Sequence, residues 1–469
     1  MARIETINPA TGETLRTYEE YDDEQLVYKL ARAWTFYVDE WRHTPIDERA
    51  KVLSSAAEVL DRRREEFAEL ITTEMGKPIA ASRSEIEKCA WLCRHYVERA
   101  AQYLQAEEIG SEADRSYVRF DPLGPILAVM PWNFPFWQAF RFAVPNLVAG
   151  NVGLLKHSSN TTGCGLAIEE VFAQAGLPEG GFQTLVIGHG KAAEVIGDDR
   201  IRGATITGSD RAGRAIASTA GQHLKKTVLE LGGSDPCIVL EDADLDDAAA
   251  VACQSRYLNS GQSCINAKRI IVLRSVYEEF LQRFREEVVD LVVGDPMDEG
   301  TEVGPLARGD LRDVVADQVA RTLQHRDGGT LVLGGETLDR PGFYYAPTIL
   351  RDVNAEAPAA KEEVFGPVAA VMDAEDEEVA VALANSSRYG LGAAVWTSDL
   401  ERGQRLAERI ESGMVFINEL TKSDPRLPFG GVKDSGYGRE LAREGAREFT
   451  NHKTVWVSRP ATAQGGLVE

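Results

Sequence analysis

Short apolar runs that alternate with stretches suited to helices make up most of the chain from about residue 116 onward. The first series of runs is Pro125–Met130, Val152–Lys156, Thr184–Ile187, Ala204–Thr207 and Thr227–Leu229. The second series is Cys237–Leu240, Arg269–Leu273, Thr330–Leu333, Val368–Met372, Ala393–Trp396 and Val415–Asn418. Strands that alternate with helices form parallel sheets with right-handed crossovers. We therefore expect an α/β fold with two units that meet near Gly232-Gly233.

The two ends of the chain depart from this pattern. Residues 1–20 are predicted to pair through a turn at residues 8–12, and helices are expected from there to about residue 105. The clearest helix has Thr44 as its cap and Pro45 at its first position, and its apolar face runs to Met75 before Gly76. The short apolar strand Thr454–Val457 either pairs with its own chain or adds to another subunit's sheet, and we favour the second.

The composition excludes several classes of protein. A net charge of −23 over 469 residues disfavours binding to nucleic acid or to an anionic membrane. The sequence contains no run of about 18 apolar residues, so no membrane span is expected. Six scattered cysteines without a CxxC pattern, and an N-terminus without a secretory apolar region, indicate the cytoplasm. Cys89 and Cys93 lie four apart on a predicted helix, where a structural role is favoured over a metal site, and no metal is expected.

Polar loops follow several of the predicted strands, at the edge where open α/β sheets bind ligands. They are residues 131–135 (PWNFP), 156–160 (KHSSN), 207–213 (TGSDRAG) and 230–233 (ELGG). Asn133 supplies an amide donor on a turn that two prolines fix, and Lys156 precedes small polar residues that suit a ribose or a phosphate. The amides that follow Gly208 can face a phosphate. Glu230 is a carboxylate beside flexible backbone.

Cys264, in the stretch NSGQSCIN at 259–266, is the candidate nucleophile. Its neighbours are small or carry amides, and the stretch interrupts two apolar runs, which predicts a turn that presents the thiol into a cleft. Free cysteines are among the most often buried residues. Taken alone, Cys264 therefore does not decide between a nucleophile and a core residue.

A set of motifs in a fixed order adds to this prediction: PWNFP, TGSxxxG, ELGG, GQSC, EEVFGP at 362–367 and PFGG at 428–431. Together with Glu230, 34 residues before Cys264, they make the chain resemble the NAD(P)-dependent aldehyde dehydrogenase superfamily over essentially its full length. The segments WNFPFWQAFRF and LLKHSSN are most similar to the bacterial NADP-preferring succinate-semialdehyde dehydrogenases.

The resemblance implies a mechanism for the candidate residues. Cys264 would attack the aldehyde carbon, because a thiolate forms the tetrahedral adduct better than water does. The Asn133 amide and the Cys264 backbone N–H would stabilise the oxyanion. After hydride transfer leaves a thioester, Glu230 would activate the hydrolytic water. Glu440 matches a second glutamate with a proton-relay role, although Arg439 or Arg443 could simply pair with it.

The resemblance also implies cofactor-binding residues, with NADP preferred and NAD possible. Lys156 would hold the adenosine ribose, Ser209 the pyrophosphate and Glu363 the nicotinamide ribose. The remaining expected cofactor contacts are Trp132, Gly208, Leu231 and Phe365. Ser159 stands where many NAD-preferring relatives carry a glutamate that would repel a 2′-phosphate, and this substitution favours NADP.

The substrate is predicted from a smaller set of residues. Arg141 matches an arginine that relatives use for the carboxylate of succinate semialdehyde, with a structural ion pair as the alternative. Leu258 stands where many of these enzymes carry a second arginine, and Lys422, Ser423 and Arg426 could compensate. The main alternative is therefore another aldehyde: aliphatic, glutarate semialdehyde or phosphorylated. A non-catalytic structural or binding relative is disfavoured because Cys264, Glu230 and Asn133 are all present.

The expected fold is aldehyde dehydrogenase-like, with a Rossmann-like cofactor domain, an α/β catalytic domain and a small β oligomerisation extension. The expected boundaries are 1–116 and 139–231 for the cofactor domain, 232–436 for the catalytic domain, and 117–138 and 437–469 for the extension. A homodimer or homotetramer that binds a small-molecule aldehyde is implied.

Overall fold

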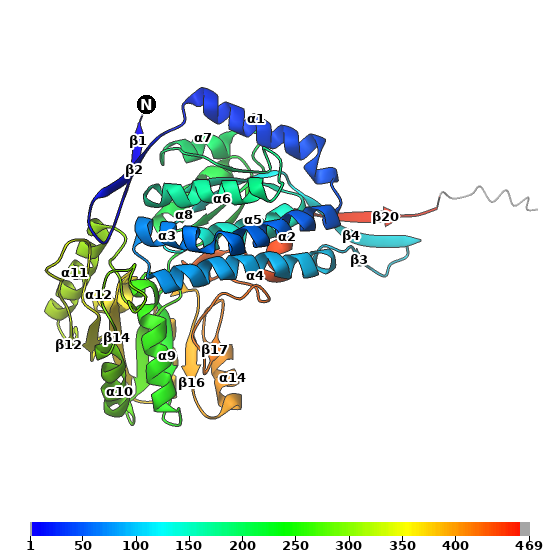
Figure 1. The fold of residues 1–469 in the computed structure, drawn as a ribbon. Helices are drawn as coiled ribbons and strands as arrows, with labels where there is room; N and C mark the ends of the chain where they lie inside the picture. Colours follow the sequence, from blue (N-terminus) through cyan, green and yellow to red (C-terminus); the bar gives the residue numbers. More distant parts are fainter. Residues whose placement is uncertain (1, 460–469) are drawn as a thin grey trace, which may run out of the picture.

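The computed structural model describes residues 2–459, and Figure 1 shows two lobes with a strand pair that projects from the first. The first lobe is built on a six-stranded sheet. In spatial order its strands are β19 (Gly436–Tyr437), β9 (Lys226–Glu230), β8 (Gly203–Thr207), β5 (Pro125–Met130), β6 (Val152–His157) and β7 (Phe182–Thr184). All pairs are parallel except that of β19 with β9. The α/β prediction is confirmed, although β7 ends where the predicted strand Thr184–Ile187 was expected to begin.

The second lobe contains a seven-stranded sheet. In spatial order its strands are β12 (Thr330–Leu333), β13 (Thr348–Arg351), β14 (Val368–Ala374), β11 (Ala267–Leu273), β10 (Asp235–Val239), β16 (Ala394–Trp396) and β17 (Phe416–Ile417). β12 was expected among the parallel strands, but it pairs antiparallel with β13, a strand not predicted from the sequence. The connection 334–347 contains no helix, whereas the crossover between two parallel strands usually contains one.

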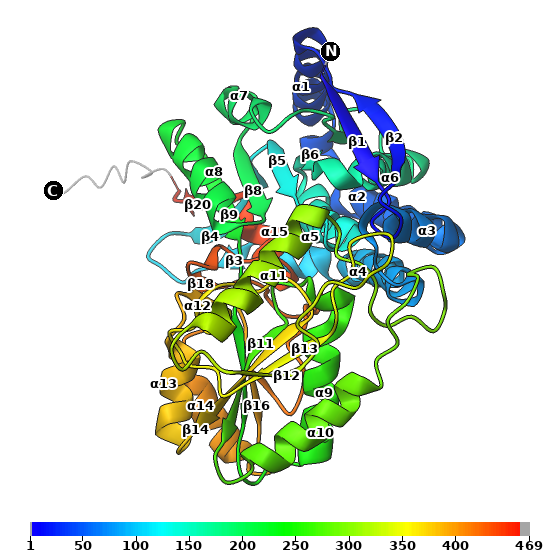
Figure 2. The ribbon, with the colours of Figure 1, turned by 90° about the vertical axis from the view of Figure 1, so that its left-hand side faces the viewer.

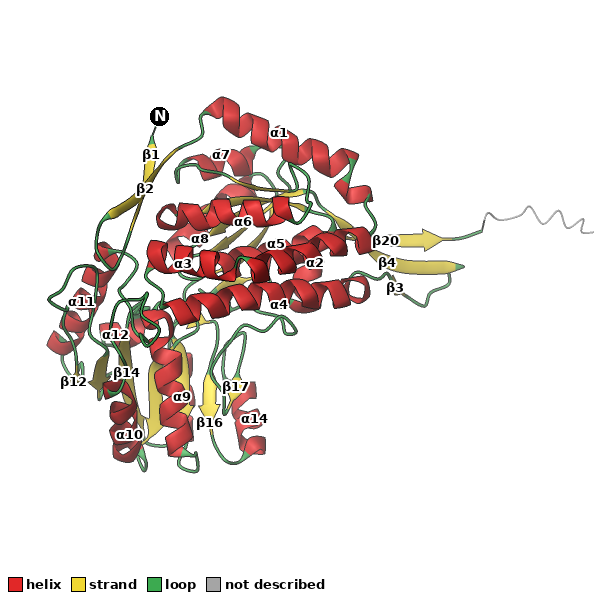
Figure 3. Cartoon of the chain, viewed as in Figure 1, coloured by secondary structure: helices red, strands yellow, loops and turns green. Residues whose placement is uncertain are grey.

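Helices cover both sheets. Figure 3 shows a layer of helices in front of the first sheet: α2 (Ile46–Arg62), α3 (Arg64–Met75), α4 (Ile79–Tyr103), α5 (Pro135–Ala149) and α6 (Thr162–Gln174), with α4 beside the second lobe. The other helices of this lobe are α1 (Asp23–Asp39), α7 (Lys191–Gly197), α8 (Asp210–Gln222) and α15 (Ala442–Glu448). Figure 2 shows the second sheet between helices on its two sides. These are α9 (Leu245–Tyr257) and α10 (Tyr277–Val289) on one side, and α13 (Glu377–Asn385) and α14 (Leu400–Arg409) on the other, with α11 (Gly309–Gln324) and α12 (Pro358–Lys361) nearer the first lobe.

The helix predicted from Thr44 to Met75 is two helices. Arg63 leaves helical geometry (φ −106, ψ 21), and its guanidinium binds Glu66 of α3 and Glu170 of α6. Thr44 does not cap α2, because its hydroxyl donates to the Glu40 carbonyl instead. Gly76 ends α3 with φ +81, as the sequence predicted.

The C-terminal strand β20 (Thr450–Val457) pairs antiparallel with β4 (Arg115–Pro122), which also pairs with β3 (Glu107–Glu108). The strand therefore pairs with its own chain, and the favoured alternative of addition to another subunit was wrong for this edge. The first segment of the predicted oligomerisation extension, residues 117–138, also includes β5, which is an inner strand of the first sheet. β1 (Arg3–Ile7) and β2 (Thr14–Glu19) pair as expected. Within residues 2–459, no helix is long and apolar enough to cross a membrane.

Candidate active site

The loop that carries Cys264 lies between α9 and β11 and has an unusual backbone. Asn259, Ser260 and Gly261 have φ of 54°, 55° and 74°, within the short 3-10 segment Leu258–Gly261. Non-glycine residues adopt this conformation at a cost that surrounding contacts must offset. Asn259 supplies such contacts, because its side-chain amide donates to the Gln262 carbonyl at 3.1 Å and to the Asn133 carbonyl at 2.8 Å. The loop is therefore held in a fixed shape before the thiol.

Asn133 binds the same loop from the other lobe. It follows β5, is 3% exposed, and its Nδ2 donates to the Gln262 carbonyl at 3.0 Å. The sequence prediction that Asn133 and Cys264 belong to one site agrees with this contact, which joins residues 129 apart in the chain.

Cys264 lines two cavities. The larger, of about 380 Å³, has a wall formed by α4, α5 and residues 420–423. The smaller, of about 250 Å³, lies between the first-lobe strand ends and residues 363–365. Cys264 is partly exposed, whereas the other five cysteines are buried. Two reactants can therefore reach one thiol from different cavities.

The environment of Cys264 favours the protonated thiol. Burial raises the thiol pKa to about 12, and the charges of Glu363 and Asp235 raise it further. The Lys268 ammonium and the Arg141 guanidinium act in the opposite direction. Deprotonation before attack therefore needs a proton acceptor or a change in this environment.

Lys268, which was not identified from the sequence, binds the backbone of the Cys264 loop. Its ammonium donates to the carbonyls of Ser263 at 2.7 Å and Cys264 at 2.8 Å, and it lies 3.5 Å from a Glu363 oxygen. It is 1% exposed at the start of β11. A lysine four residues after a candidate nucleophile, at the start of an apolar strand, was the signal that could have found it.

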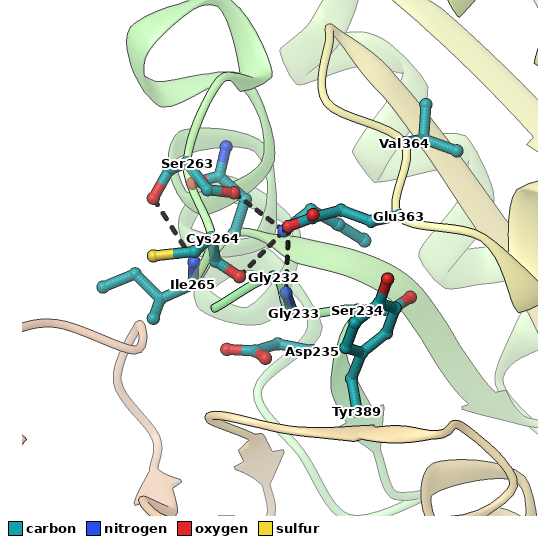
Figure 4. Close-up of polar contacts among 12 residues, drawn as sticks. Gly232, Gly233, Ser234, Asp235, Ser263, Cys264, Ile265, Glu363, Val364 and Tyr389 are labelled. Atoms are coloured by element: carbon teal, nitrogen blue, oxygen red, sulfur yellow. Dashed lines mark hydrogen bonds and ion pairs between the residues drawn. The ribbon is translucent and has the colours of Figure 1, made fainter. Parts of the chain in front are cut away.

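Glu363, the carboxylate predicted to bind a ribose, lies on the wall of the smaller cavity. Its Oε1 accepts the Gly233 amide at 2.9 Å, and Figure 4 shows the side chain reaching toward the Gly232–Gly233 backbone. A Cβ at Gly232 would lie 2.4 Å from Glu363 Oε2, so only glycine leaves room for this carboxylate. Trp132 and Phe365 line the same cavity with their rings at right angles and centroids 5.7 Å apart.

The turn before α8 supplies the rest of this cavity. Gly208, Ser209 and Leu231, three of the residues predicted to contact a cofactor, line it. Ser209 is the N-cap of α8, and its hydroxyl accepts the Ala212 amide at 3.3 Å. A helix N-terminus with free amides favours a phosphate. Gly213 allows α8 to pack on Leu231, because a Cβ there would lie 2.5 Å from the leucine side chain. This donor set fits the pyrophosphate of a dinucleotide.

Lys156 and Ser159 lie at the end of β6, apart from this cavity. Ser159 lines a third cavity, of about 310 Å³, together with His189 and Arg308, two residues not singled out from the sequence. Lys156 donates to the His157 carbonyl at 3.1 Å, and burial lowers its pKa to about 8. The Lys156 charge is the largest cause of the lowered pKa of His189, so the two side chains are neighbours.

Glu230 and Glu440, as the structure of residues 2–459 has them, are not among the lining residues of the two cavities that contain Cys264. Within the described residues, Glu230 is 2% exposed and has no hydrogen-bond partner for either oxygen. Burial, and next the Glu440 charge, raise its pKa well above the usual value. The ion-pair partner of Glu440 is Arg141, not Arg439 or Arg443 as the sequence suggested.

The predicted substrate residues divide into two groups. Arg141, Lys422 and Ser423 line the larger cavity with Cys264. Arg141 is also a buried structural residue, because it pairs with Glu440 and donates to Thr207 at 3.3 Å. Arg426 is placed elsewhere: it pairs with Asp424 at 2.6 Å on the surface and is not in this lining.

Comparisons with known proteins agree with this geometry. The model of the aldehyde dehydrogenase family matches residues 1–455. A probable NADP+-dependent succinate-semialdehyde dehydrogenase of Synechocystis sp. is 53% identical over 97% of this chain and 100% of its own length. An NADP+-dependent succinate-semialdehyde dehydrogenase of Mycobacterium avium is 46% identical over 99% of each chain. The crystal structure of succinic semialdehyde dehydrogenase from Streptococcus pyogenes in complex with NADP+ superposes with a TM-score of 0.95, at 38% identity, over 97% of this chain and 100% of that one.

Proposed function

The chain belongs to the aldehyde dehydrogenase family, and we propose that it oxidises succinate semialdehyde to succinate with NADP+. The observation that carries this proposal is the position of Cys264 in the lining of two cavities, one with cationic side chains and one with the expected cofactor residues. The full-length similarity to two NADP+-dependent succinate-semialdehyde dehydrogenases supports the choice of substrate and cofactor.

The first chemical step uses Cys264 and Asn133. The thiolate attacks the aldehyde carbon and forms a thiohemiacetal, with the negative charge on the former carbonyl oxygen. Asn133 Nδ2 carries two hydrogens, of which one is bonded to Gln262, so the second is free for this oxygen. The Cys264 backbone N–H is the second donor of the proposed oxyanion site.

The bound NADP+ supplies the acceptor for the hydride that leaves the thiohemiacetal carbon. Trp132, Glu363 and Phe365 would hold the nicotinamide end beside Cys264, and the α8 N-terminus would bind the pyrophosphate. The thioester on Cys264 is then hydrolysed by water that Glu230 deprotonates. For this step the Glu230 side chain has to turn from its position beside Gly430 toward Cys264, since it lies in the lining of neither cavity.

The preference for NADP over NAD rests on Lys156 and Ser159. Lys156 is an ammonium without a carboxylate partner among residues 2–459, and Ser159 adds a hydroxyl where a glutamate would repel the 2′-phosphate. A Ser159→Glu variant is expected to lower kcat/KM for NADP at least tenfold while kcat/KM for NAD rises or stays constant. An unchanged cofactor ratio would contradict this part of the proposal.

A second candidate function is the oxidation of a different aldehyde. Leu258, 39% exposed on the wall of the larger cavity, favours this alternative because it contributes an apolar surface where a second arginine would hold a carboxylate. A spectrophotometric panel of succinate semialdehyde, glutarate semialdehyde, butanal and a phosphorylated aldehyde, each with NADP and NAD, separates the two. The proposal fails if succinate semialdehyde does not have the highest kcat/KM.

The same proposal includes a cytoplasmic homodimer or homotetramer, with residues 232–436 acting as the catalytic domain. Six free cysteines are consistent with a reducing compartment. β20 lies at the edge of its three-stranded sheet, and Trp456 on this strand is 52% exposed. Static light scattering of the full chain measures the assembly directly, and a monomer would contradict this part.

A further inference from the structure

The larger cavity has an imbalance of charge. Its charged lining residues are Lys77, Glu85, Lys88, Arg141 and Lys422. Among these cations, three have carboxylate partners: Lys77 pairs with Glu85, Arg141 with Glu440, and Lys422 with Glu419. Lys88 forms no ion pair within residues 2–459. A cation in a partly buried cavity without a counter-ion is a natural binding site for an anionic ligand.

Lys88 is held in place by neutral groups. Its ammonium donates to the Ser423 hydroxyl at 2.9 Å and lies 4.3 Å from the centroid of the Trp137 ring. The Trp137 indole N–H, in the same lining, has no hydrogen-bond partner within the described residues although the side chain is 4% exposed. These contacts fix the position of the charge without neutralising it.

The surroundings of Lys88 disfavour its charge. Burial lowers its pKa to about 8, and the Arg141 guanidinium lowers it next. Cys89, Glu85 and Asp424 act in the opposite direction. A carboxylate bound beside Lys88 and Arg141 would offset the two causes of the lowered Lys88 pKa, burial and the Arg141 charge. An anionic ligand therefore interacts more strongly with this lysine than with an exposed one.

We propose that Lys88, together with the Ser423 hydroxyl, binds the distal carboxylate of the aldehyde substrate, and that it supplies the cation missing at Leu258. This inference rests on the proposed function and deepens it, because it names the residue that selects aldehydes with a terminal carboxylate. Lys88 lies on α4, on the face that also carries Ala81, Ser84 and Glu85 into the cavity. It does not line the smaller cavity, which contains the expected nicotinamide-side residues, so the role that we propose for it is specificity.

The test compares Lys88→Met and Lys88→Arg with the wild-type enzyme, with succinate semialdehyde and butanal as substrates. Lys88→Met keeps most of the length of the side chain and removes its charge. It is expected to lower kcat/KM for succinate semialdehyde about 10-fold to 100-fold, mainly through KM, and to change kcat/KM for butanal less than about threefold. Lys88→Arg is expected to restore part of the loss. Arg94→Met, which removes the partner of Asp61 on the outer face of the same helix, is the matched control.

Inhibition by succinate gives a second measurement that needs no turnover of the semialdehyde. With butanal as the substrate, succinate is expected to inhibit the wild type at lower concentration than Lys88→Met, again by about tenfold or more. Equal losses with both aldehydes, or unchanged succinate inhibition, would overturn the role of Lys88. If the wild type itself does not prefer succinate semialdehyde to butanal, the proposed function fails. Succinate inhibition then still shows whether Lys88 binds carboxylates.

Discussion

Asn133 donates its side-chain amide to the carbonyl of Gln262, 3.0 Å away and two residues before Cys264. The contact crosses from the end of β5 in the first lobe to the nucleophile loop of the second. It uses one of the two amide hydrogens and leaves the other for the reacting oxygen. One side chain therefore positions the loop and keeps a second hydrogen for the oxyanion contact that we propose.

Asn133→Ala is expected to lower kcat about 10²-fold to 10³-fold, because one donor to the oxyanion is lost. KM for the cofactor should change little. Alkylation of Cys264 by iodoacetamide serves as the control for the loop. A lowered alkylation rate, equal in size to the loss of kcat, would mean that Asn133 acts only by positioning the thiol.

Lys268→Met is expected to shift the reactivity of Cys264 to higher pH. The Lys268 ammonium is the largest charge that lowers the pKa of this thiol, so its removal raises that pKa further. The rate of alkylation measured from pH 6 to pH 10 reports the shift. In this variant Glu363 and Asp235 also lose their neighbouring cation. Removing one member of such a buried charge cluster lowers the free energy of unfolding by about 3–5 kcal/mol. Lys268→Arg retains the charge, and a profile equal to that of Lys268→Met would contradict the explanation.

Arg256→Met is expected to destabilise the protein by about 3 kcal/mol or more, since several buried carbonyls lose their donor. Arg256 is fully buried and donates to the carbonyls of Gly261, Val364, Gly366 and Val368. These carbonyls flank the nucleophile loop and Glu363. Arg274→Met is the matched control, because Arg274 pairs with Asp373 on the surface, where a pair is worth about 0–1 kcal/mol. Similar midpoints of thermal unfolding for the two variants would refute the prediction.

The specificity for a carboxylate-bearing aldehyde should depend on pH. Below about pH 8 the Lys88 ammonium is charged, and above it the free enzyme loses this proton, since the pKa is lowered to about 8. A bound carboxylate raises that pKa, so the loss appears in kcat/KM rather than in kcat. The ratio of kcat/KM for succinate semialdehyde to that for butanal is therefore expected to fall as pH rises above about 8. The fall should be absent in Lys88→Arg, and a ratio that does not change between pH 7 and pH 9.5 would contradict the prediction.

Glu230→Gln is expected to separate the two halves of the reaction. Acyl transfer to Cys264 needs no hydrolytic base, whereas release of the acid does, so NADPH should form in a first-turnover burst followed by a steady rate at least about 10²-fold below wild type. Stopped-flow absorbance at 340 nm measures both phases. Loss of the burst together with the steady rate would assign Glu230 to activation of the thiol instead.

The sequence predicted the strands of the fold only as far as local patterns reach. Strands with flanking helices, such as β5, β6 and β8, were found because each apolar run is short and bounded. β13 was missed in the sequence. β12 was given the wrong direction, because the direction of a strand depends on the content of the connection to its neighbour. The pairing of β20 with β4 joins segments more than 300 residues apart, and no local pattern specifies it.

Some residues of the candidate site were predicted from the sequence and others were not, because local patterns do not show contacts between distant segments. Cys264 and Asn133 stand in distinctive motifs, and the structure joins them through Gln262. Lys88, Lys268 and Arg256 stand in ordinary helix and strand sequence, where a cation usually faces solvent. Their roles arise from neighbours distant in sequence: the bond of Lys88 to Ser423 spans 335 residues. Arg426 is the opposite case: it was predicted as a substrate residue, but its bond to the nearby carboxylate of Asp424 holds it on the surface.

The placement of α4 has a consequence for the design of chimeric enzymes. Glu85 on this helix accepts the amides of Phe136 and Trp137 at the start of α5, so the two helices that wall the larger cavity are fastened to each other and to the first lobe. An exchange of residues 235–417 with those of a relative would replace the nucleophile and leave this wall unchanged. The contribution of Lys88 and Arg141 to selectivity for the far end of the aldehyde should therefore be inherited with the first lobe, whereas the contribution of Leu258 and the reactivity of the thiol should be inherited with the second.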